Sequence, residues 1–281
     1  MTERYGARLT ALVAARGPLC VGVDPHPQLL AQWGLQPDVS GLERCARSLV
    51  EAVGERVAVL KPQSAFFEVY GSAGIVVLER VLADIRAAGA LSILDVKRGD
   101  IGSTMAAYAA AYLSDDSALA ADAITLSPYL GFGSLRGAVD LAASTGRGVY
   151  VLALTSNPEG PQIQHAVTST GDSVAETVVR AAAATNAANP AGVLGHVGIV
   201  VGATVGRTGV DFGSLNGSIL APGIGAQGAD AGDLVEVFGG ALPLVLPSVS
   251  REVMSAGPRL DDLRDAAART LADMVAVTSL G

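Results

Sequence analysis

Cysteine and histidine are both scarce in this chain of 281 residues, and their scarcity limits the redox and metal chemistry open to it. The two cysteines, Cys20 and Cys45, are too far apart for a CxxC redox pair and fit no set of zinc ligands. The three histidines, His26, His165 and His196, have neither HExxH nor HxH spacing. The sequence therefore supports no metal site, and we expect two free buried thiols.

Long apolar runs are absent as well, because charged residues, glycine or proline interrupt each run before it reaches the length of a membrane span. The first residues, MTERYGARLT, lack the apolar stretch of a secretory signal. Positive charge is also in short supply, since the net charge is -8 and the sequence pI is near 4.9. Broad contact with nucleic acid or an anionic membrane needs a dense basic patch, so we expect a cytoplasmic protein with neither partner.

Apolar residues, by contrast, make up half of the chain and charged residues only 16%, which provides ample material for a large core. The length exceeds that of most single domains, yet α/β barrels commonly use such a length as one unit. No linker rich in serine and proline divides the sequence. We therefore predict one domain over residues 1–281.

Short runs rich in β-branched residues alternate with Ala-rich helical segments, such as 72–88 and 261–277, along the whole chain. This alternation is typical of β/α units on a parallel sheet, whose buried strands are almost continuously apolar. The expected strands cover residues 19–24, 57–62, 91–97, 123–127, 148–155, 196–203, 218–222 and 242–247. Eight strands predict a (β/α)8 TIM barrel, with a polar loop at 156–170 that is long enough to move over a site.

A doubly wound open sheet is the main alternative to the barrel. An open sheet concentrates its binding site at one switch point in the strand order. In this sequence polar residues follow nearly every expected strand, at the end where barrel enzymes carry their active sites. The distribution of polar residues therefore favours the barrel.

Charged residues gather at the end of the third expected strand. Side chains alternate along a strand, so Asp95 and Lys97 are expected to face the barrel mouth together. Lys61 ends the preceding strand, and Asp100 lies just past the third. Because a buried charge needs an opposite partner, these four residues predict an alternating network. A purely structural ion-pair cluster is the alternative, but the position at the catalytic face of a barrel favours a role in the chemistry.

Glycine-rich loops follow the seventh and eighth expected strands, where barrels commonly bind phosphate. The segment 221–228 contains Gly225, Gln227 and Gly228, and glycines let backbone N–H groups approach an anion closely. An ordinary turn is the alternative for this segment alone. Arg251 on the next loop adds a guanidinium, which strengthens the prediction of a phosphate site.

Polar residues at the ends of other strands are further candidates for substrate contacts. Asp24 follows the first expected strand, and a carboxylate there suits the hydroxyls of a ribose. Ser127, Thr155 and Ser156 follow the fourth and fifth strands. Each of these could instead cap a turn.

The run DVKRGDIGST at 95–104 resembles the Asp-x-Lys-x-x-Asp-Ile-x-x-Thr signature of orotidine 5'-phosphate decarboxylases. Lys61, the GIVVGAT run at 198–204 and the two phosphate loops extend the likeness over essentially the whole barrel. The segments LKPQSAFFE, SPYLG and LPSVSRE resemble the longer, second branch of that family.

The resemblance implies a cofactor-free enzyme that converts orotidine 5'-phosphate to uridine 5'-phosphate in pyrimidine synthesis. It implies that Lys97 protonates C6 of the pyrimidine after carbon dioxide leaves, with Asp95 near the substrate carboxylate. Lys61 and Asp100 would complete the charge network. The physical logic agrees, because without a cofactor to accept the electron pair, fixed cations must stabilise the developing anion.

The resemblance also implies where the rest of the substrate binds. Asp24 and Lys61 would hold ribose hydroxyls, and Thr155 or Ser156 the pyrimidine amide. Gln227 and Arg251 would hold the phosphate. Ser127 stands where many second-branch relatives carry asparagine, so its role stays open. Family members are dimers in which the second Asp and the Thr of the signature reach the partner's substrate, which implies a homodimer with shared active sites through Asp100 and Thr104.

Two other functions remain as alternatives. One is a sugar-phosphate lyase or decarboxylase of the same barrel superfamily, such as a hexulose-phosphate synthase, which is magnesium-dependent and carries an acid on the second strand. Lys61 at that strand favours the metal-free reaction. The other is a barrel that binds a phosphate ligand without catalysis, which the complete set of four charges disfavours.

Overall fold

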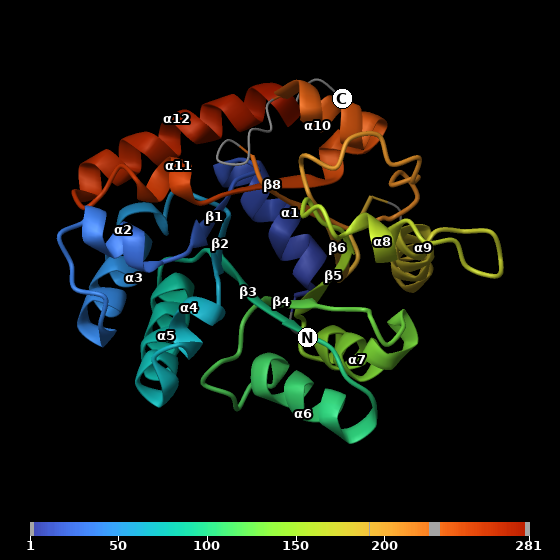
Figure 1. Ribbon diagram of the computed structural model, residues 1–281, viewed down its shortest axis with the longest axis horizontal. Helices are drawn as coiled ribbons and strands as arrows, with labels where there is room; N and C mark the ends of the chain where they lie inside the picture. Colours follow the sequence, from blue (N-terminus) through green and yellow to red (C-terminus); the bar gives the residue numbers. More distant parts are fainter. Residues whose placement is uncertain (1–2, 191, 225–230, 279–281) are drawn as a thin grey trace.

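The computed structural model describes residues 3–190, 192–224 and 231–278, and its strands form a closed parallel barrel in sequence order (Figure 1). The strands are β1 (Cys20–Val23), β2 (Val59–Pro62), β3 (Leu91–Arg98), β4 (Ala123–Leu126), β5 (Gly148–Leu154), β6 (Val197–Val201), β7 (Ile219–Pro222) and β8 (Val245–Val249). The predicted (β/α)8 fold is confirmed, and the open sheet is wrong because β1 pairs directly with β8.

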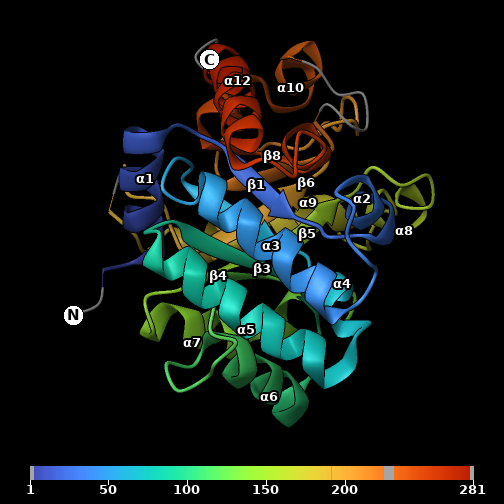
Figure 2. The ribbon, with the colours of Figure 1, turned by 90° about the vertical axis from the view of Figure 1, so that its left-hand side faces the viewer.

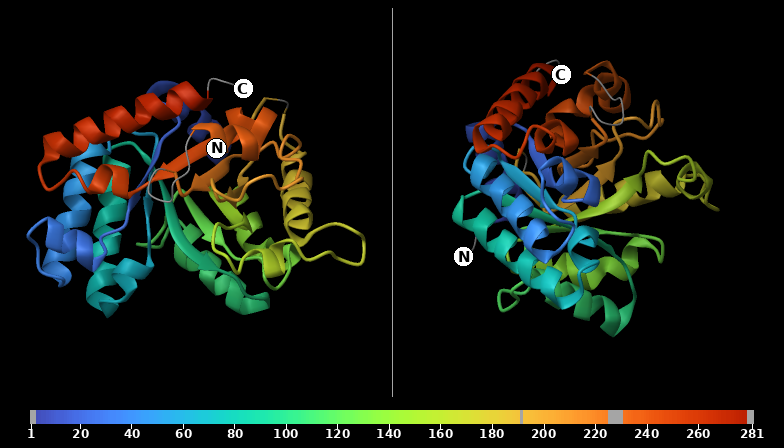
Figure 3. Two further views of the ribbon diagram at one scale, coloured as in Figure 1. Left: turned by 45° about the horizontal axis from the view of Figure 1, so that its top comes forward. Right: turned by 60° about the vertical axis from the view of Figure 1, so that its left-hand side comes forward.

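Helices surround this barrel in the order expected of repeated β/α units (Figure 2). They are α1 (Tyr5–Arg16), α2 (Pro27–Gln32), α3 (Val39–Val53), α4 (Ala65–Glu68), α5 (Gly71–Ala87), α6 (Gly102–Leu113), α7 (Arg136–Ser144), α8 (Pro161–Gln164), α9 (Val174–Asn186), α10 (Ala231–Phe238), α11 (Arg251–Met254) and α12 (Leu260–Thr278), with 3-10 turns η1 (Phe132–Leu135) and η2 (Gly239–Leu244). The last helix, α12, packs against α3 and so closes the outer layer (Figure 3). Within the described ranges, no helix combines the length and apolarity needed to cross a membrane.

The first helix closes one end of the barrel. Tyr5 and Leu9 of α1 are buried among the side chains that fill the barrel interior. The Tyr5 hydroxyl lies 3.0 Å from that of Tyr150 on β5, which gives each buried phenol a hydrogen-bond partner. Access to the interior therefore comes from the opposite end, where the strands have their carboxyl termini.

Two expectations about local structure need correction. β8 begins at Val245, three residues later than expected, because η2 occupies residues 239–244 and contains Pro243. The apolar run LPL belongs to this 3-10 turn and does not join the strand. The loop expected at 156–170 contains the short helix α8, which starts with Pro161 at its first position.

The pairing of β3 with β4 is irregular where the charged residues begin. Leu94 pairs with Ile124 and Arg98 with Leu126, so residues 95–97 lie opposite Thr125 alone. Lys97 has a φ of 46°, in the left-handed region that a non-glycine residue rarely adopts. The sequence suggested that regular strand alternation places Asp95 and Lys97 on the same side, but the strand is not regular here. The bulge brings their side chains together instead.

Candidate active site

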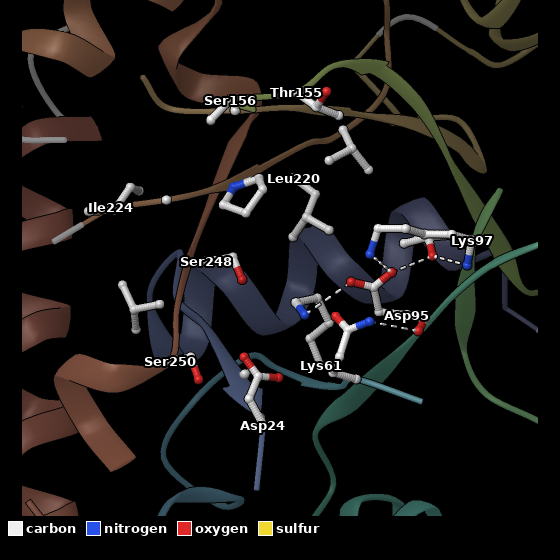
Figure 4. Close-up of a pocket in the computed structure, with 18 of the residues that line it drawn as sticks. Asp24, Lys61, Asp95, Lys97, Thr155, Ser156, Leu220, Ile224, Ser248 and Ser250 are labelled. Atoms are coloured by element: carbon white, nitrogen blue, oxygen red, sulfur yellow. Dashed lines mark hydrogen bonds and ion pairs between the residues drawn. The ribbon is translucent and has the colours of Figure 1, made fainter. Parts of the chain in front are cut away.

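A cavity of about 550 Å³ opens at the carboxyl ends of the strands (Figure 4). This is the end of a TIM barrel where active sites lie. Side chains from both halves of the barrel line the cavity. The predicted site residues among them are Asp24, Lys61, Asp95, Lys97, Thr155, Ser156 and Arg251.

Asp95 is the centre of the charged part of the cavity. Its Oδ2 atom accepts from Lys61 Nζ at 3.3 Å, and its Oδ1 atom accepts from Lys97 Nζ at 2.6 Å. The Thr125 hydroxyl donates to the same Oδ1 at 2.7 Å. The side chains of Lys61 and Asp95 are each 8% exposed, whereas that of Lys97 is 47% exposed. One buried ion pair thus supports a second cation that reaches into the cavity.

The two buried members of this network keep their charges. Burial opposes ionisation of Asp95, but the ammonium groups of Lys61 and Lys97 outweigh it and lower the pKa of Asp95 to about 2. Burial likewise opposes the charge on Lys61, yet the carboxylates of Asp24 and Asp95 raise the pKa of Lys61 above its ordinary value. Asp95 and Lys61 are therefore charged throughout the neutral pH range.

Asp24 joins Lys61, Asp95 and Lys97 in one row of charged side chains, which we call the charged row, whereas the sequence suggested only a ribose contact for it. It lies beyond Lys61, so that the row runs Asp24, Lys61, Asp95, Lys97 across the cavity (Figure 4). Its Oδ1 atom is buried and has no hydrogen-bond partner within the described part of the chain. A buried acceptor without a donor is costly, and the hydroxyl of a bound ligand would satisfy it.

Asp100 is not part of the row within one chain. Its carboxylate accepts from the backbone N–H of Ile101 at 2.8 Å, and the residue does not line the cavity. Thr104, on the exposed first turn of α6, also lies outside it. Ser127 pairs through its backbone N–H with the carbonyl of Arg98 and does not reach the cavity either. Within one chain the cavity therefore contains three members of the predicted network, Lys61, Asp95 and Lys97, and the participation of Asp100 across a dimer interface stays a prediction.

The phosphate loops are described only in part. Gly225, Gln227 and Gly228 lie outside the described residues. Arg251 begins α11 two residues after the end of β8, is exposed, and lines the cavity. A guanidinium is thus available at the edge of the cavity.

The segment after β5 forms the side of the cavity opposite the charged row (Figure 4). The Thr155 hydroxyl accepts from Gln164 Nε2 at 2.6 Å, while the Thr155 N–H donates to Gln164 Oε1 at 2.9 Å. Ser156 fits because Gly202 has no side chain; a Cβ at that position would lie 2.2 Å from the Ser156 hydroxyl. The lining between these segments is apolar and includes Leu154, Val200, Leu220 and Ile224. A flat, weakly polar ring would suit this lining.

Thr125 is a residue of this cavity that sequence reasoning missed. It is 1% exposed, lies on β4, and hydrogen-bonds to both Asp95 and Lys97. A polar residue inside an otherwise apolar strand was the available signal. Nothing in its own segment linked it to Asp95, because that link depends on how β4 pairs with β3.

Within the described ranges, no three side chains of histidine, cysteine, aspartate or glutamate lie grouped as a metal site would need. Both cysteines are free and buried, as expected from the sequence.

Comparison with known proteins identifies relatives over nearly the whole chain. Residues 17–266 match the model of the Orotidine 5'-phosphate decarboxylase / HUMPS family. An orotidine 5'-phosphate decarboxylase of Salinispora arenicola is 61% identical over 272 residues, covering 96% of this chain and 97% of its own length. One from Streptomyces coelicolor is 58% identical over 268 residues, covering 95% of each chain.

The solved structures that this chain resembles carry the same kind of name as these sequence relatives. A Streptomyces avermitilis protein provisionally assigned as an orotidine 5'-phosphate decarboxylase is 57% identical, with a TM-score of 0.95 over 99% of this chain and 97% of its own. The OMP decarboxylase of Leishmania donovani is 29% identical, with a TM-score of 0.76 over 98% of this chain and 99% of its own. The similarity therefore covers the complete barrel.

Proposed function

The chain belongs to the orotidine 5'-phosphate decarboxylase family, and we propose that the charges around Asp95 perform the decarboxylation that this membership assigns to it. The substrate is orotidine 5'-phosphate and the product is uridine 5'-phosphate. The reaction removes a carboxylate from the pyrimidine ring and replaces it with a proton.

Lys97 is the proton donor in this proposal. The bond between C6 and the carboxylate breaks, its electron pair stays on C6, and carbon dioxide leaves. The Lys97 ammonium stabilises the negative charge that develops on C6 and then donates a proton to it. Lys97 afterwards regains a proton from water. The observation that carries the proposal is that the Lys97 side chain is half exposed while its ammonium is bound by the buried carboxylate of Asp95.

Asp95 and Lys61 prepare Lys97 for this role. Asp95 remains ionised because its pKa is lowered to about 2, so it orients the Lys97 ammonium at all working pH values. In the proposal the substrate carboxylate lies beside Asp95, and the repulsion between the two carboxylates ends when carbon dioxide leaves. Lys61, paired with the other oxygen, offsets the charge of Asp95 before substrate binds.

The remaining contacts extend from the charged row toward the rim. Asp24, with its unpartnered Oδ1 atom, is proposed to accept from a ribose hydroxyl. Ser156 at the opposite side is proposed to bind the pyrimidine amide, whereas the polar atoms of Thr155 already bond to Gln164. Arg251 at the rim is proposed to bind the phosphate, with Gln227 and its neighbouring glycines.

Dimerisation is proposed to complete the site. The loops after β3 and β4 lie side by side, because Ser127 N–H donates to the Arg98 carbonyl. These loops expose apolar side chains, with Ile101 63% and Tyr129 79% exposed. Exposed apolar residues next to a catalytic cavity are typical of an interaction surface. A second copy bound there would receive Asp100 and Thr104, which fits their position outside the cavity of their own chain.

Loss of orotidine 5'-phosphate absorbance in the presence of the purified protein tests the function. We expect turnover by the wild type, undiminished by EDTA because no step of the proposed reaction uses a metal. Lys97→Ala should lower kcat by at least about a thousandfold, since it removes both the cation and the proton donor.

The matched control is Arg136→Ala, which removes a cation from an exposed pair with Asp140 on α7. Its kcat should equal that of the wild type. Absence of turnover by the wild type would refute the proposed function. Equal rates for Lys97→Ala and the wild type would instead remove Lys97 from the mechanism.

A further inference from the structure

Thr125 uses its single hydroxyl for two hydrogen bonds that meet at the charged row. The hydroxyl donates to Asp95 Oδ1 at 2.7 Å and accepts from the backbone N–H of Lys97 at 2.9 Å. The residue is 1% exposed, so its hydroxyl is largely shielded from solvent. One side chain thus ties the carboxylate of one residue to the backbone of the other.

The bulge in β3 explains why the Lys97 N–H needs such a partner. Between the pairs Leu94–Ile124 and Arg98–Leu126, three residues of β3 face one residue of β4. The carbonyls of β4 are therefore too few for a regular ladder across this stretch. The Thr125 hydroxyl takes the place of a ladder carbonyl and accepts a hydrogen bond from the Lys97 N–H group.

The same bond holds Lys97 in an unfavourable backbone conformation. Its φ of 46° is unfavourable for a residue with a Cβ atom, so the surroundings must fix it. Arg98, the residue after Lys97, is itself anchored, because its guanidinium donates to Glu68 at 2.8 Å and lies over the ring of Tyr108. Thr125 is the anchor on the cavity side.

The orientation of the Asp95 carboxylate depends on Thr125 as well. Oδ2 is bound by Lys61, and Oδ1 receives both the Lys97 ammonium and the Thr125 hydroxyl. Lys97 is half exposed and gives up a proton in the proposed reaction, whereas Thr125 is neutral and buried. The hydroxyl therefore keeps Oδ1 in place while Lys97 donates its proton.

We propose that Thr125 is a positioning residue for the decarboxylation, which aligns the Lys97 ammonium through both the Asp95 carboxylate and the Lys97 backbone. This inference rests on the proposed function of Lys97. Thr125 acts through its two neighbours and does not contact the ribose or phosphate in the proposal. Its effect should therefore fall on kcat and spare KM.

Thr125→Val tests this role, because valine has nearly the same shape and no hydroxyl. We expect kcat to fall about 10- to 100-fold, as for loss of hydrogen bonds to a charged group, with KM within about twofold of the wild type. Thr125→Ser restores the hydroxyl and should recover kcat to within about threefold of the wild type. Ser218→Ala, which removes another buried barrel hydroxyl outside the cavity lining, should leave both constants unchanged.

A second measurement reports geometry without turnover. Lys61 and Lys97 are the two lysines of the sequence, so protein labelled with ¹³C-lysine gives two side-chain signals in an NMR spectrum. Thr125→Val should shift or broaden the Lys97 signal, and Thr125→Ser should not. If Thr125→Val fails to fold, Thr125→Cys, with its weak donor, replaces it in both experiments. Wild-type kcat in a folded Val or Cys variant, or equal loss in the Ser and Val variants, would overturn the proposal.

Discussion

Lys61 and Lys97 are the two lysines of the sequence, and they donate to different oxygens of one carboxylate, that of Asp95. Every other cationic side chain except histidine is an arginine. Lysine carries a compact charge that can give up a proton, whereas arginine remains protonated in proteins. The chain thus holds its lysines where the proposed chemistry needs a cation and a proton donor.

The first prediction concerns the charge of Lys61. Burial favours the neutral amine, but Asp24 and Asp95 raise its pKa above the ordinary lysine value of 10.5. The contribution of Lys61 to stability is therefore fully present below pH 10.5 and is lost only as the pH rises through the higher value of the folded protein. In protein labelled with ¹³C-lysine, the Lys61 signal should not titrate between pH 7 and about 10.5. Asp24→Asn should lower its titration midpoint. A wild-type midpoint at or below 10.5 would contradict this account.

The second prediction concerns the stability that Asp95 provides. Removing one partner of a buried ion pair leaves the other charge uncompensated, so Asp95→Ala should lower the free energy of unfolding by about 3 kcal/mol. Urea denaturation at pH 7 measures this change. Arg136→Ala, which breaks an exposed pair, should lie within about 0.5 kcal/mol of the wild type.

The pH dependence of the Asp95 contribution follows from its lowered pKa. The unfolded chain protonates this carboxyl near pH 3.8 and the folded protein near pH 2. Its stabilisation is therefore present above pH 3.8 and is lost as the pH falls toward 2. An Asp95→Ala variant as stable as the wild type at pH 7 would show that the pair contributes nothing net.

The barrel could be predicted from the sequence because its strands are buried on both sides. Such strands read as short apolar runs wherever they occur, and α5 and α12 have apolar residues at helical spacing. The pairing of Lys61 with Asp95 followed from the adjacency of consecutive strands in a barrel. These inferences need only local pattern and chain order.

Other features of the site depend on pairing between distant segments and were not predictable. The contact of Asp95 with Lys97 was expected from strand alternation but arises from a bulge, whose position is set by pairing with β4. In the sequence alone Thr125 cannot be told from any other buried threonine, because its bonds to Lys97 and Asp95 depend on that pairing. Asp100 was expected just past the strand, and its carboxylate there accepts from the N–H of Ile101; whether it acts in its own site or in the partner's depends on how two chains pair.

The third prediction is a loss of stability at alkaline pH. Burial raises the pKa of Cys20, Cys45 and Tyr150 to about 12, while their ordinary values are 9.0 for the thiols and 10.0 for the phenol. The unfolded chain ionises these groups first, so stability is full below pH 9 and falls as the pH rises toward 12. Each ionising group contributes a slope of about 1.4 kcal/mol per pH unit.

Cys45→Ala isolates one of these groups. Urea unfolding at pH 7.5, 9 and 10 should show a shallower decline for the variant than for the wild type, because one buried acid is missing. The native thiols should also react slowly with a disulfide reagent at pH 8, since both are buried. Identical pH slopes for the two proteins would exclude Cys45 as a source of the decline.

The last prediction tests the proposed shared site at the exposed apolar loops. Ile101→Glu places a charge on the proposed dimer surface, where burial of an unpaired carboxylate is costly. We expect sedimentation to show a shift from dimer to monomer. The kcat should fall at low protein concentration and recover in part as the concentration rises, because association restores the partner's contribution.

Val76→Glu is the matched control, since Val76 is 42% exposed and belongs to α5 and not to the loops after β3 and β4. It should leave both assembly and kcat unchanged. An Ile101→Glu variant that stays dimeric would place the interface elsewhere. A monomer with full kcat at every concentration would show that Asp100 and Thr104 are not needed in trans, because each chain would then be complete without its partner.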